Sequence, residues 1–103
     1  MSPRAPVVAG MFYPADERTC RRQIEDALSG LSPSVEGTIW GGIVPHAGWT
    51  FSGRTAAHVY AALQAQGAPE TVVFFGAVHS WGVSGASLYG AGSWRTPLGS
   101  LEI

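Results

Sequence analysis

Two short apolar runs dominate the pattern of hydrophobic and polar positions along the chain. Residues 39–45 and 71–76 are rich in β-branched and aromatic side chains, with glycine and proline interspersed, a pattern typical of short buried strands. Between them, residues 54–66 carry apolar side chains at helical spacing. A strand, a helix and a second strand at this separation predict a βαβ unit with parallel strands and a right-handed crossover. The sequence therefore predicts an α/β fold, with a partial sheet built on a parallel βαβ core.

A further helix is predicted over residues 16–29. Asp16 is a suitable N-cap, and Gly30 is a suitable residue to end the helix. The face that we expect to point inward is apolar and consists of Cys20, Ile24, Ala27 and Leu28. Since free cysteine is commonly buried as a small apolar residue, we expect Cys20 to belong to the core rather than to a metal site.

The last part of the chain predicts strands. Residues 88–89 and 93–95 flank the segment Gly90-Ala91-Gly92, which favours a hairpin turning at the glycines. Residues 101–103 then begin what is expected to be another strand.

Composition narrows the class of protein. A chain of 103 residues with 46% hydrophobic content suits one small globular domain. A net charge of −1 offers no electrostatic footprint for nucleic acid or an acidic membrane. No apolar run is long enough to span a bilayer, and no signal peptide is expected. The single cysteine excludes an internal disulfide, which fits a cytoplasmic protein.

Two histidines follow the two predicted strands. His46 and His79 would leave the sheet at its carboxyl edge, where open α/β sheets bind ligands. Two imidazoles there could share one metal ion, with ligating nitrogens roughly 3 Å apart. Catalytic zinc and non-haem iron sites normally take three protein ligands, and no third ligand is evident. His58 lies within the predicted helix and is expected to be structural.

The loop after the first strand favours a pocket. Small residues such as Gly48 leave room for close backbone approach, Trp49 and Phe51 could form walls, and Ser52 lies beside them. Residues 9–14 also place apolar side chains in a loop, which we expect to pack on the core or line a site.

A hydrolase with Ser52 as nucleophile and His46 or His79 as base is the competing chemical hypothesis. The segment around Ser52 lacks the first glycine of a nucleophile elbow, and no acidic residue is placed to orient a base. The chain also lacks a phosphate-binding loop ending in lysine and a Rossmann fingerprint. These absences disfavour hydrolase, nucleotide-triphosphate and dinucleotide functions.

Five motifs resemble, in the same order, the N-terminal portion of the Memo family, called protein B of the AmmeMemoRadiSam system in prokaryotes. They are Arg4–Pro6 with Ala9–Pro14, Val44–Gly53, Ala56–Tyr60, Phe75–His79 and Arg95–Gly99. The resemblance covers nearly the whole chain. It implies that residues 1–103 form the N-terminal part of a Memo-like α/β domain. Family members are more than twice this long, so the resemblance also implies a truncated chain.

The resemblance implies a fold like that of class III extradiol dioxygenases, which use non-haem iron. The two family histidines fall on His46 and His79, and the implied metal is iron or copper. The family's third ligand, a cysteine, would lie beyond Ile103. This chain departs from the family's usual Gly-Pro-(Asn or Ser)-His pattern, because Ala77 and Val78 precede His79. The change removes a polar neighbour that could support the metal ligand.

Two functional hypotheses follow. The first is a metal-dependent redox protein, similar to an oxidase or dioxygenase, of unknown substrate. The second is a non-catalytic module in which the pocket of Trp49 and Phe51 binds a small molecule or peptide. Family association implies a radical-SAM system partner. Because two helices cannot cover both faces of an apolar sheet, we also expect the 103-residue chain to associate with itself or aggregate. We expect it to lack activity on its own, because two neutral histidines leave the charge of a divalent ion uncompensated and the family's third ligand would lie beyond Ile103.

Overall fold

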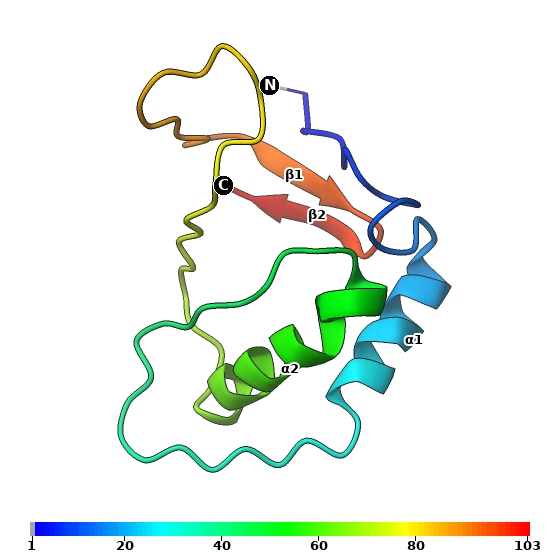
Figure 1. The fold of residues 1–103 in the computed structure, drawn as a ribbon, viewed down its shortest axis with the longest axis vertical. Helices are drawn as coiled ribbons and strands as arrows, with labels where there is room; N and C mark the ends of the chain where they lie inside the picture. Colours follow the sequence, from blue (N-terminus) through cyan, green and yellow to red (C-terminus); the bar gives the residue numbers. More distant parts are fainter. Residues whose placement is uncertain (1) are drawn as a thin grey trace.

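The computed structural model describes residues 2–103 (Figure 1). Two helices, α1 (Glu17–Leu28) and α2 (Trp49–Ala65), pack against each other. They are followed by an antiparallel hairpin of β1 (Ser93–Thr96) and β2 (Gly99–Glu102). Long extended segments connect these elements and run along the side of α2 away from α1 (Figure 1). None of the helices within residues 2–103 is long and apolar enough to cross a bilayer.

Helix α1 confirms the predicted helix over 16–29. A carboxylate oxygen of Asp16 accepts a hydrogen bond from the Thr19 backbone N–H at 2.8 Å, so Asp16 is the N-cap. Hydrogen bonds from the backbone and the side chain of Thr19 lower the pKa of the Asp16 carboxyl. The helix ends before Gly30, whose φ of +74° is strained for any residue with a side chain.

Helix α2 confirms the predicted helix over 54–66 but begins five residues earlier, at Trp49. The loop that was expected to reach residue 53 is therefore shorter. The Trp49 N–H donates to the Phe12 carbonyl at 2.8 Å, and the Ser52 N–H donates to the Gly48 carbonyl at 3.1 Å. Tertiary contact with Phe12 thus satisfies an N–H that the first turn of a helix leaves free, which offsets the low helix propensity of Gly53.

The helix pair holds the small core of the molecule. Cys20 on α1 is 2% exposed, and Ala57 on α2 is 5% exposed. The expectation that Cys20 packs in the core is thus met, and burial raises the pKa of its thiol. The Arg54 guanidinium of α2 donates to the carbonyls of Asp26 and Ala27 at 3.1 and 3.4 Å. It thereby adds a donor to carbonyl groups in the last turn of α1, where helical carbonyls lack partners from a following turn.

The two predicted strands of the βαβ unit are not formed. Within residues 2–103, segments 39–45 and 71–76 are extended but belong to no strand or sheet. Ile43 is 94% exposed, and Phe75 is 95% exposed. A helix completes its hydrogen bonds within one segment, whereas a strand needs a neighbour on at least one side. Parallel sheets also need cover on both faces, which two helices do not provide. The α/β class and the dioxygenase-like fold therefore stay predictions.

The first extended segment nevertheless touches α2 at two points. The Gln66 side-chain amide accepts from the Ile39 N–H and donates to the Gly37 carbonyl, both at 2.8 Å. Gly42 approaches α2 so closely that an added Cβ would overlap the Val59 side chain. These contacts hold segment 39–45 beside α2, the helix that was predicted to connect this segment to residues 71–76.

The hairpin forms later in the chain than predicted. Its strands pair Ser93 with Glu102 and Thr96 with Gly99, so the turn is at residues 97–98 and not at Gly90–Gly92. The Thr96 hydroxyl accepts from the Leu98 N–H at 3.1 Å and donates to the Gly99 carbonyl at 2.9 Å. This local bonding stabilises a tight turn that the spacing of the glycines did not indicate.

The N-terminal segment adds a short parallel bridge to β1. The Arg4 N–H donates to the Ser93 carbonyl at 2.8 Å, and the Arg95 N–H donates to the Arg4 carbonyl at 2.9 Å. The Arg4 guanidinium also lies over the Trp94 ring, 5.2 Å from its centroid. The two ends of the chain are therefore joined in one small sheet region.

Candidate functional site

His46 and His79 lie side by side although 33 positions separate them in the sequence. Their ring centroids are 5.4 Å apart, and the ring planes are inclined by 45°. His46 lies just before α2, and His79 ends the extended stretch that follows α2. Both side chains are exposed. The structure thus brings together the two histidines that the sequence placed at one edge, even though the strands that carry them are not paired.

The spacing of the two rings fits ligation of one metal ion. A histidine nitrogen binds a metal at about 2.0–2.1 Å, and the ring centre lies about 1 Å beyond it, so two imidazoles on one ion have centroids roughly 4.5–6 Å apart. The observed 5.4 Å falls in this range. No group of three or more His, Cys, Asp or Glu residues that could hold a metal is found among residues 2–103. The two imidazoles therefore stand as a pair, with no third candidate ligand beside them among these residues.

His58 does not take part in this pair. It lies on α2, its side chain is exposed, and it is not among the residues that line the neighbouring cavity. It serves neither as a third ligand nor as a core residue.

A cavity of about 730 Å³ adjoins the histidine pair. It lies between the two helices on one side and the extended segments on the other. Apolar and aromatic residues dominate its wall, and the polar residues of the lining are His46, His79, Gln23, Tyr60 and Ser52. The apolar and aromatic residues of the lining include Phe12, Tyr13, Ile24, Trp49, Phe74 and Phe75. A mostly apolar cavity with few polar groups is typical of sites that bind small organic molecules.

Tyr13 and Trp49 form the aromatic wall nearest the start of α2. Their rings stack with centroids 5.2 Å apart and planes inclined by 30°. The Phe12 carbonyl fixes the backbone of Trp49 beside them. The expectation that the apolar loop 9–14 packs on the core or lines a site is met, because Phe12 and Tyr13 both line the cavity.

Only two of the four residues predicted to form the pocket, Gly48, Trp49, Phe51 and Ser52, line the cavity. Trp49 and Ser52 line the cavity, whereas Phe51 is 87% exposed and is not part of the lining. A Cβ added at Gly48 would meet Phe12 and Phe51 at 3.7 Å, an ordinary contact distance, so close approach does not require glycine there. At Gly53 an added Cβ would lie 3.4 Å from the Trp49 Cβ, which is closer than at Gly48. Helix geometry explains the change, since Phe51 and Ser52 point in different directions around α2.

Ser52 is engaged with backbone rather than with a base. Its hydroxyl donates to the Ala47 carbonyl at 3.0 Å and lies 3.3 Å from the Gly48 carbonyl, and the residue is 7% exposed. No hydrogen bond joins it to His46 or His79 within the described part of the chain. The nucleophile needs a base within hydrogen-bond reach, so this geometry further disfavours the hydrolase hypothesis.

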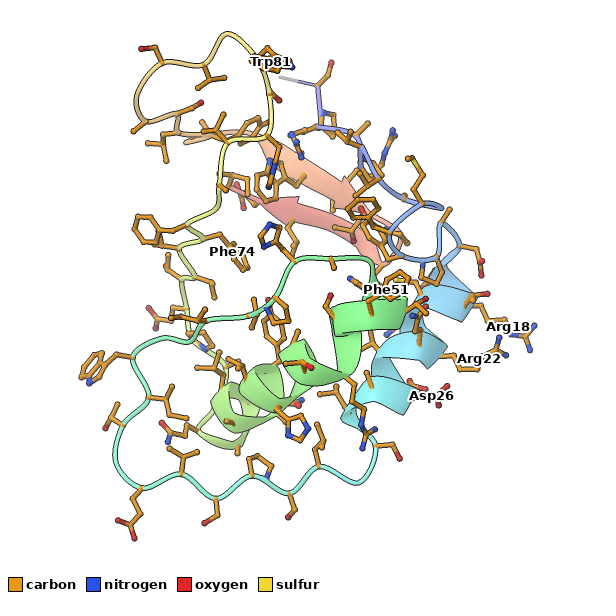
Figure 2. The ribbon with its side chains drawn as sticks, viewed as in Figure 1. Arg18, Arg22, Asp26, Phe51, Phe74 and Trp81 are labelled. Carbon is orange, nitrogen blue, oxygen red and sulfur yellow. The ribbon has the colours of Figure 1, made fainter. Side chains whose placement is uncertain are left out.

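Sequence reasoning did not identify Gln23, Tyr60 or Phe74 as residues of this cavity. The first two face it from different helices, and only the packing of α1 against α2 brings them to one wall. A signal was present for Ile24, which belongs to the predicted inner face of α1 and lines the cavity. Phe74 lies on the extended segment on the opposite side of the molecule from α1 (Figure 2). The alternation of side chains along a predicted strand did not show which residues of this segment face the cavity.

Comparison with known proteins supports the resemblance. Residues 4–103 match the family model described as Memo-like protein. The chain is 44% identical over 108 residues to a MEMO1 family protein of Methanopyrus kandleri, covering 97% of this chain and 38% of that protein. It is also 44% identical over 101 residues to a MEMO1 family protein of Thermococcus onnurineus, covering 97% of this chain and 34% of that protein. A third relative, a MEMO1 family protein of Methanothermobacter thermautotrophicus, is 43% identical over 107 residues, covering 97% of this chain and 39% of that protein.

No solved structure matches the chain. The chain spans little more than a third of the length of the curated relatives that it matches. The matched region nevertheless includes both histidines, the cavity and the hairpin, since it begins at Arg4 and continues to Ile103. This chain therefore belongs to the Memo-like protein family.

Proposed function

We propose that His46 and His79 bind one iron or copper ion at the wall of the cavity, as part of a metal-dependent redox protein similar to an oxidase or dioxygenase. The observation that carries this proposal is the 5.4 Å separation of two imidazole rings from segments far apart in the sequence. Such an ion, when bound, supplies one-electron chemistry and reaction with dioxygen.

The residues of this chain would bind and position the reactants. His46 and His79 ligate through neutral nitrogens, and imidazole suits both iron and copper. The aromatic wall of Tyr13 and Trp49 would hold an organic substrate beside the histidines. Gln23 and the Tyr60 hydroxyl offer hydrogen bonds that could orient it.

Two neutral ligands leave the charge of a divalent ion uncompensated. A third ligand that carries negative charge, such as the cysteine implied by the family resemblance, would supply the compensation. Among residues 2–103 no third ligand joins the pair. We therefore expect the 103-residue chain to bind the metal weakly and to show no turnover by itself.

A titration with Cu²⁺ or Fe²⁺ under anaerobic conditions tests the site. We expect binding of one equivalent, and we expect His46→Ala and His79→Ala each to weaken it by at least about tenfold, since loss of a ligand or its support commonly costs 10- to 100-fold. His58→Ala is the matched control, because it removes an exposed histidine outside the cavity. Equal losses in all three variants, or none, would contradict the proposal.

A comparison of turnover tests the redox role. Oxygen consumption with phenolic and other aromatic test substrates would be measured for the 103-residue chain and for the full-length Methanopyrus kandleri relative. We expect activity only in the full-length protein, and only when its equivalents of His46 and His79 are intact. Activity of the relative that persists without those histidines would refute the assignment.

The second candidate is a binding module without catalysis. The cavity of about 730 Å³ and its stacked Tyr13 and Trp49 favour it, because they could hold a small molecule or peptide side chain without a metal. Tight binding of an aromatic probe in the presence of EDTA, weakened by Trp49→Ala and not strengthened by adding Cu²⁺ or Fe²⁺, would favour this candidate over the redox protein.

A further inference from the structure

Ser52 is the one buried polar side chain among residues 2–103, with 7% of its surface exposed. Burial of a hydroxyl costs free energy unless the group is hydrogen-bonded. The Ser52 hydroxyl donates to the Ala47 carbonyl at 3.0 Å and lies 3.3 Å from the Gly48 carbonyl. The proposed redox site gives this group no role, although Ser52 lines the cavity together with His46 and His79. The carbonyl that it bonds indicates what the hydroxyl does.

The Ser52 hydroxyl does not cap helix α2. A side chain that caps the start of a helix accepts from the free N–H groups of the first turn. Here the Trp49 N–H donates to the Phe12 carbonyl. The N–H groups of Phe51 and Ser52 donate to the Gly48 carbonyl. The hydroxyl instead donates to a carbonyl that precedes Gly48, the N-cap residue. The bond therefore connects the helix to the loop before it.

The Ala47 carbonyl directly follows His46 in the chain. Among residues 2–103, no backbone N–H donates to this carbonyl, so the Ser52 hydroxyl is the group that fixes its direction. At this corner the extended segment before α2 turns into the helix (Figure 1). Because a single residue connects the bonded carbonyl to His46, the direction of that carbonyl determines how the chain at His46 leaves α2.

The other histidine of the pair has no comparable anchor. Within the described chain, no backbone hydrogen bond joins residues 76–80 to another segment. The pair, with ring centroids 5.4 Å apart, thus combines His46 on a segment tied to α2 with His79 on a segment that is not tied. A functional side chain must be held within about 0.5 Å of its productive position. The anchor at His46 therefore matters all the more for the geometry of the pair.

We propose that Ser52 is a positioning residue for the histidine pair, and that its bond to the Ala47 carbonyl holds the His46 imidazole beside that of His79. A serine hydroxyl has one hydrogen to donate, and the Ala47 carbonyl occupies it. Ser52 thus acts through the loop and touches neither metal nor substrate. The consequence for metal binding rests on the proposed function, whereas the arrangement of the two rings does not require a metal.

Nuclear magnetic resonance of the histidine-labelled 103-residue chain, with EDTA present, tests the arrangement of the rings. We expect nuclear Overhauser contacts between the ring protons of His46 and His79 in the parent chain. Ser52→Ala should abolish these contacts and leave the far-ultraviolet circular dichroism of the helices unchanged, because the hydroxyl takes no part in the helical ladder. A role confined to helix stability would leave the ring contacts intact well below the thermal midpoint.

Two further variants separate the hydroxyl from other effects of substitution. Ser52→Thr keeps a hydroxyl, and a threonine hydroxyl in a helix can bond a carbonyl of the preceding turn. Its additional methyl group enters a buried position, so we expect a lower thermal midpoint but retained ring contacts. Thr50→Ala is the matched control, because it removes an exposed hydroxyl from the same turn of α2.

A titration with Cu²⁺ measures the consequence for the metal site. Loss of a group that supports a metal ligand commonly lowers affinity 10- to 100-fold. We expect Ser52→Ala to weaken Cu²⁺ binding at least about tenfold by this rule, and Ser52→Thr and Thr50→Ala to stay near the parent affinity. The electron paramagnetic resonance spectrum of the Ser52→Ala complex should also show fewer coordinated histidine nitrogens than that of the parent.

The ring contacts decide the proposal. It is overturned if they are absent from the parent chain, if they persist in Ser52→Ala, or if Thr50→Ala or Ser52→Thr loses them as completely as Ser52→Ala does. A parent chain that binds no Cu²⁺, but whose rings separate only in Ser52→Ala, would contradict the proposed metal function and support the role of Ser52. Binding of Cu²⁺ by both histidines with equal affinity in the parent and in Ser52→Ala would contradict this inference alone.

Discussion

The helix pair and the extended segments 39–45 and 71–78 differ in their degree of order, and the more apolar of the two regions is the more exposed. In α1 and α2, small residues such as Cys20 and Ala57 are nearly completely buried. Side chains also bond both ends of α1, Asp16 at its start and Arg54 at its end. In the extended segments 39–45 and 71–78, larger residues such as Ile43 and Phe75 are almost fully exposed. Figure 2 shows the charged residues Arg18 and Arg22 on the outer side of α1, away from the other elements.

The difference comes from where each element finds its hydrogen bonds. A helix completes its own ladder and needs a neighbour only for its apolar stripe, which α1 and α2 supply to each other. A strand needs neighbours for its backbone and for both of its faces when it belongs to a parallel sheet. Apolar content alone therefore does not decide which region is ordered and which is exposed.

A substitution in the helix pair should have the largest effect. We expect Ala57→Leu to destabilise the chain by about 1–3 kcal/mol, because the larger side chain overpacks a position that is 5% exposed. Phe75→Ala removes a much larger side chain, yet it should change stability by less than about 0.5 kcal/mol because Phe75 is 95% exposed. Urea unfolding followed by far-ultraviolet circular dichroism measures both. A cost for Phe75→Ala as large as that for Ala57→Leu would remove the contrast between the two regions.

A pair of neighbouring glycines tests the boundary between the regions. An added Cβ at Gly42 would overlap the Val59 side chain, whereas at Gly41 it would meet nothing within 4 Å. We expect Gly42→Ala to cost about 1 kcal/mol or more, since Val59 is stiff in a helix and cannot move aside freely. Gly41→Ala should be close to neutral. If both variants unfold at the same urea concentration as the parent chain, segment 39–45 is not held against α2.

The smallest expected effect concerns the start of α1. Asp16→Ala removes the acceptor for the Thr19 N–H and should lower the thermal midpoint at neutral pH. Because the pKa of Asp16 is lowered in the folded chain, its contribution is fully present above the ordinary value of 3.8 and is lost as the pH falls through the lowered pKa. The difference between the variant and the parent chain should therefore shrink in acid.

Asp26→Ala is the control for this measurement. Asp26 lies near the other end of α1, and its backbone carbonyl, which is kept in the variant, is the atom that binds Arg54. We expect little change in the thermal midpoint. A loss in Asp16→Ala that stays constant down to strongly acidic pH would show that the carboxylate is not the stabilising group.

The helices were predictable because their signals are local. Asp16, Gly30 and the apolar spacing of α1 determined its bounds almost to the residue. The start of α2 was missed by five residues, because the Phe12 carbonyl that binds the Trp49 N–H comes from a distant loop. The hairpin was misplaced because Thr96 bonds its own turn, whereas the more conspicuous Gly90 and Gly92 do not form one.

The candidate site shows the same division. The sequence singled out His46 and His79 from two apolar runs, and the structure places their rings together. It did not identify Gln23 and Tyr60, which reach one cavity only because α1 packs against α2. Phe51 was predicted to be part of the wall, but the direction imposed by α2 leaves it in solvent.

The sequence by itself determined the two helices, the burial of Cys20, the pair of histidines and, through its motifs, the family. Only the tertiary structure decided that Trp49 begins a helix, that the turn lies at 97–98, and that residues 39–45 and 71–76 remain unpaired. The physical reason is the range of the interactions. Caps and helical periodicity act within a few residues, whereas strand pairing and cavity walls depend on partners that are distant in the chain.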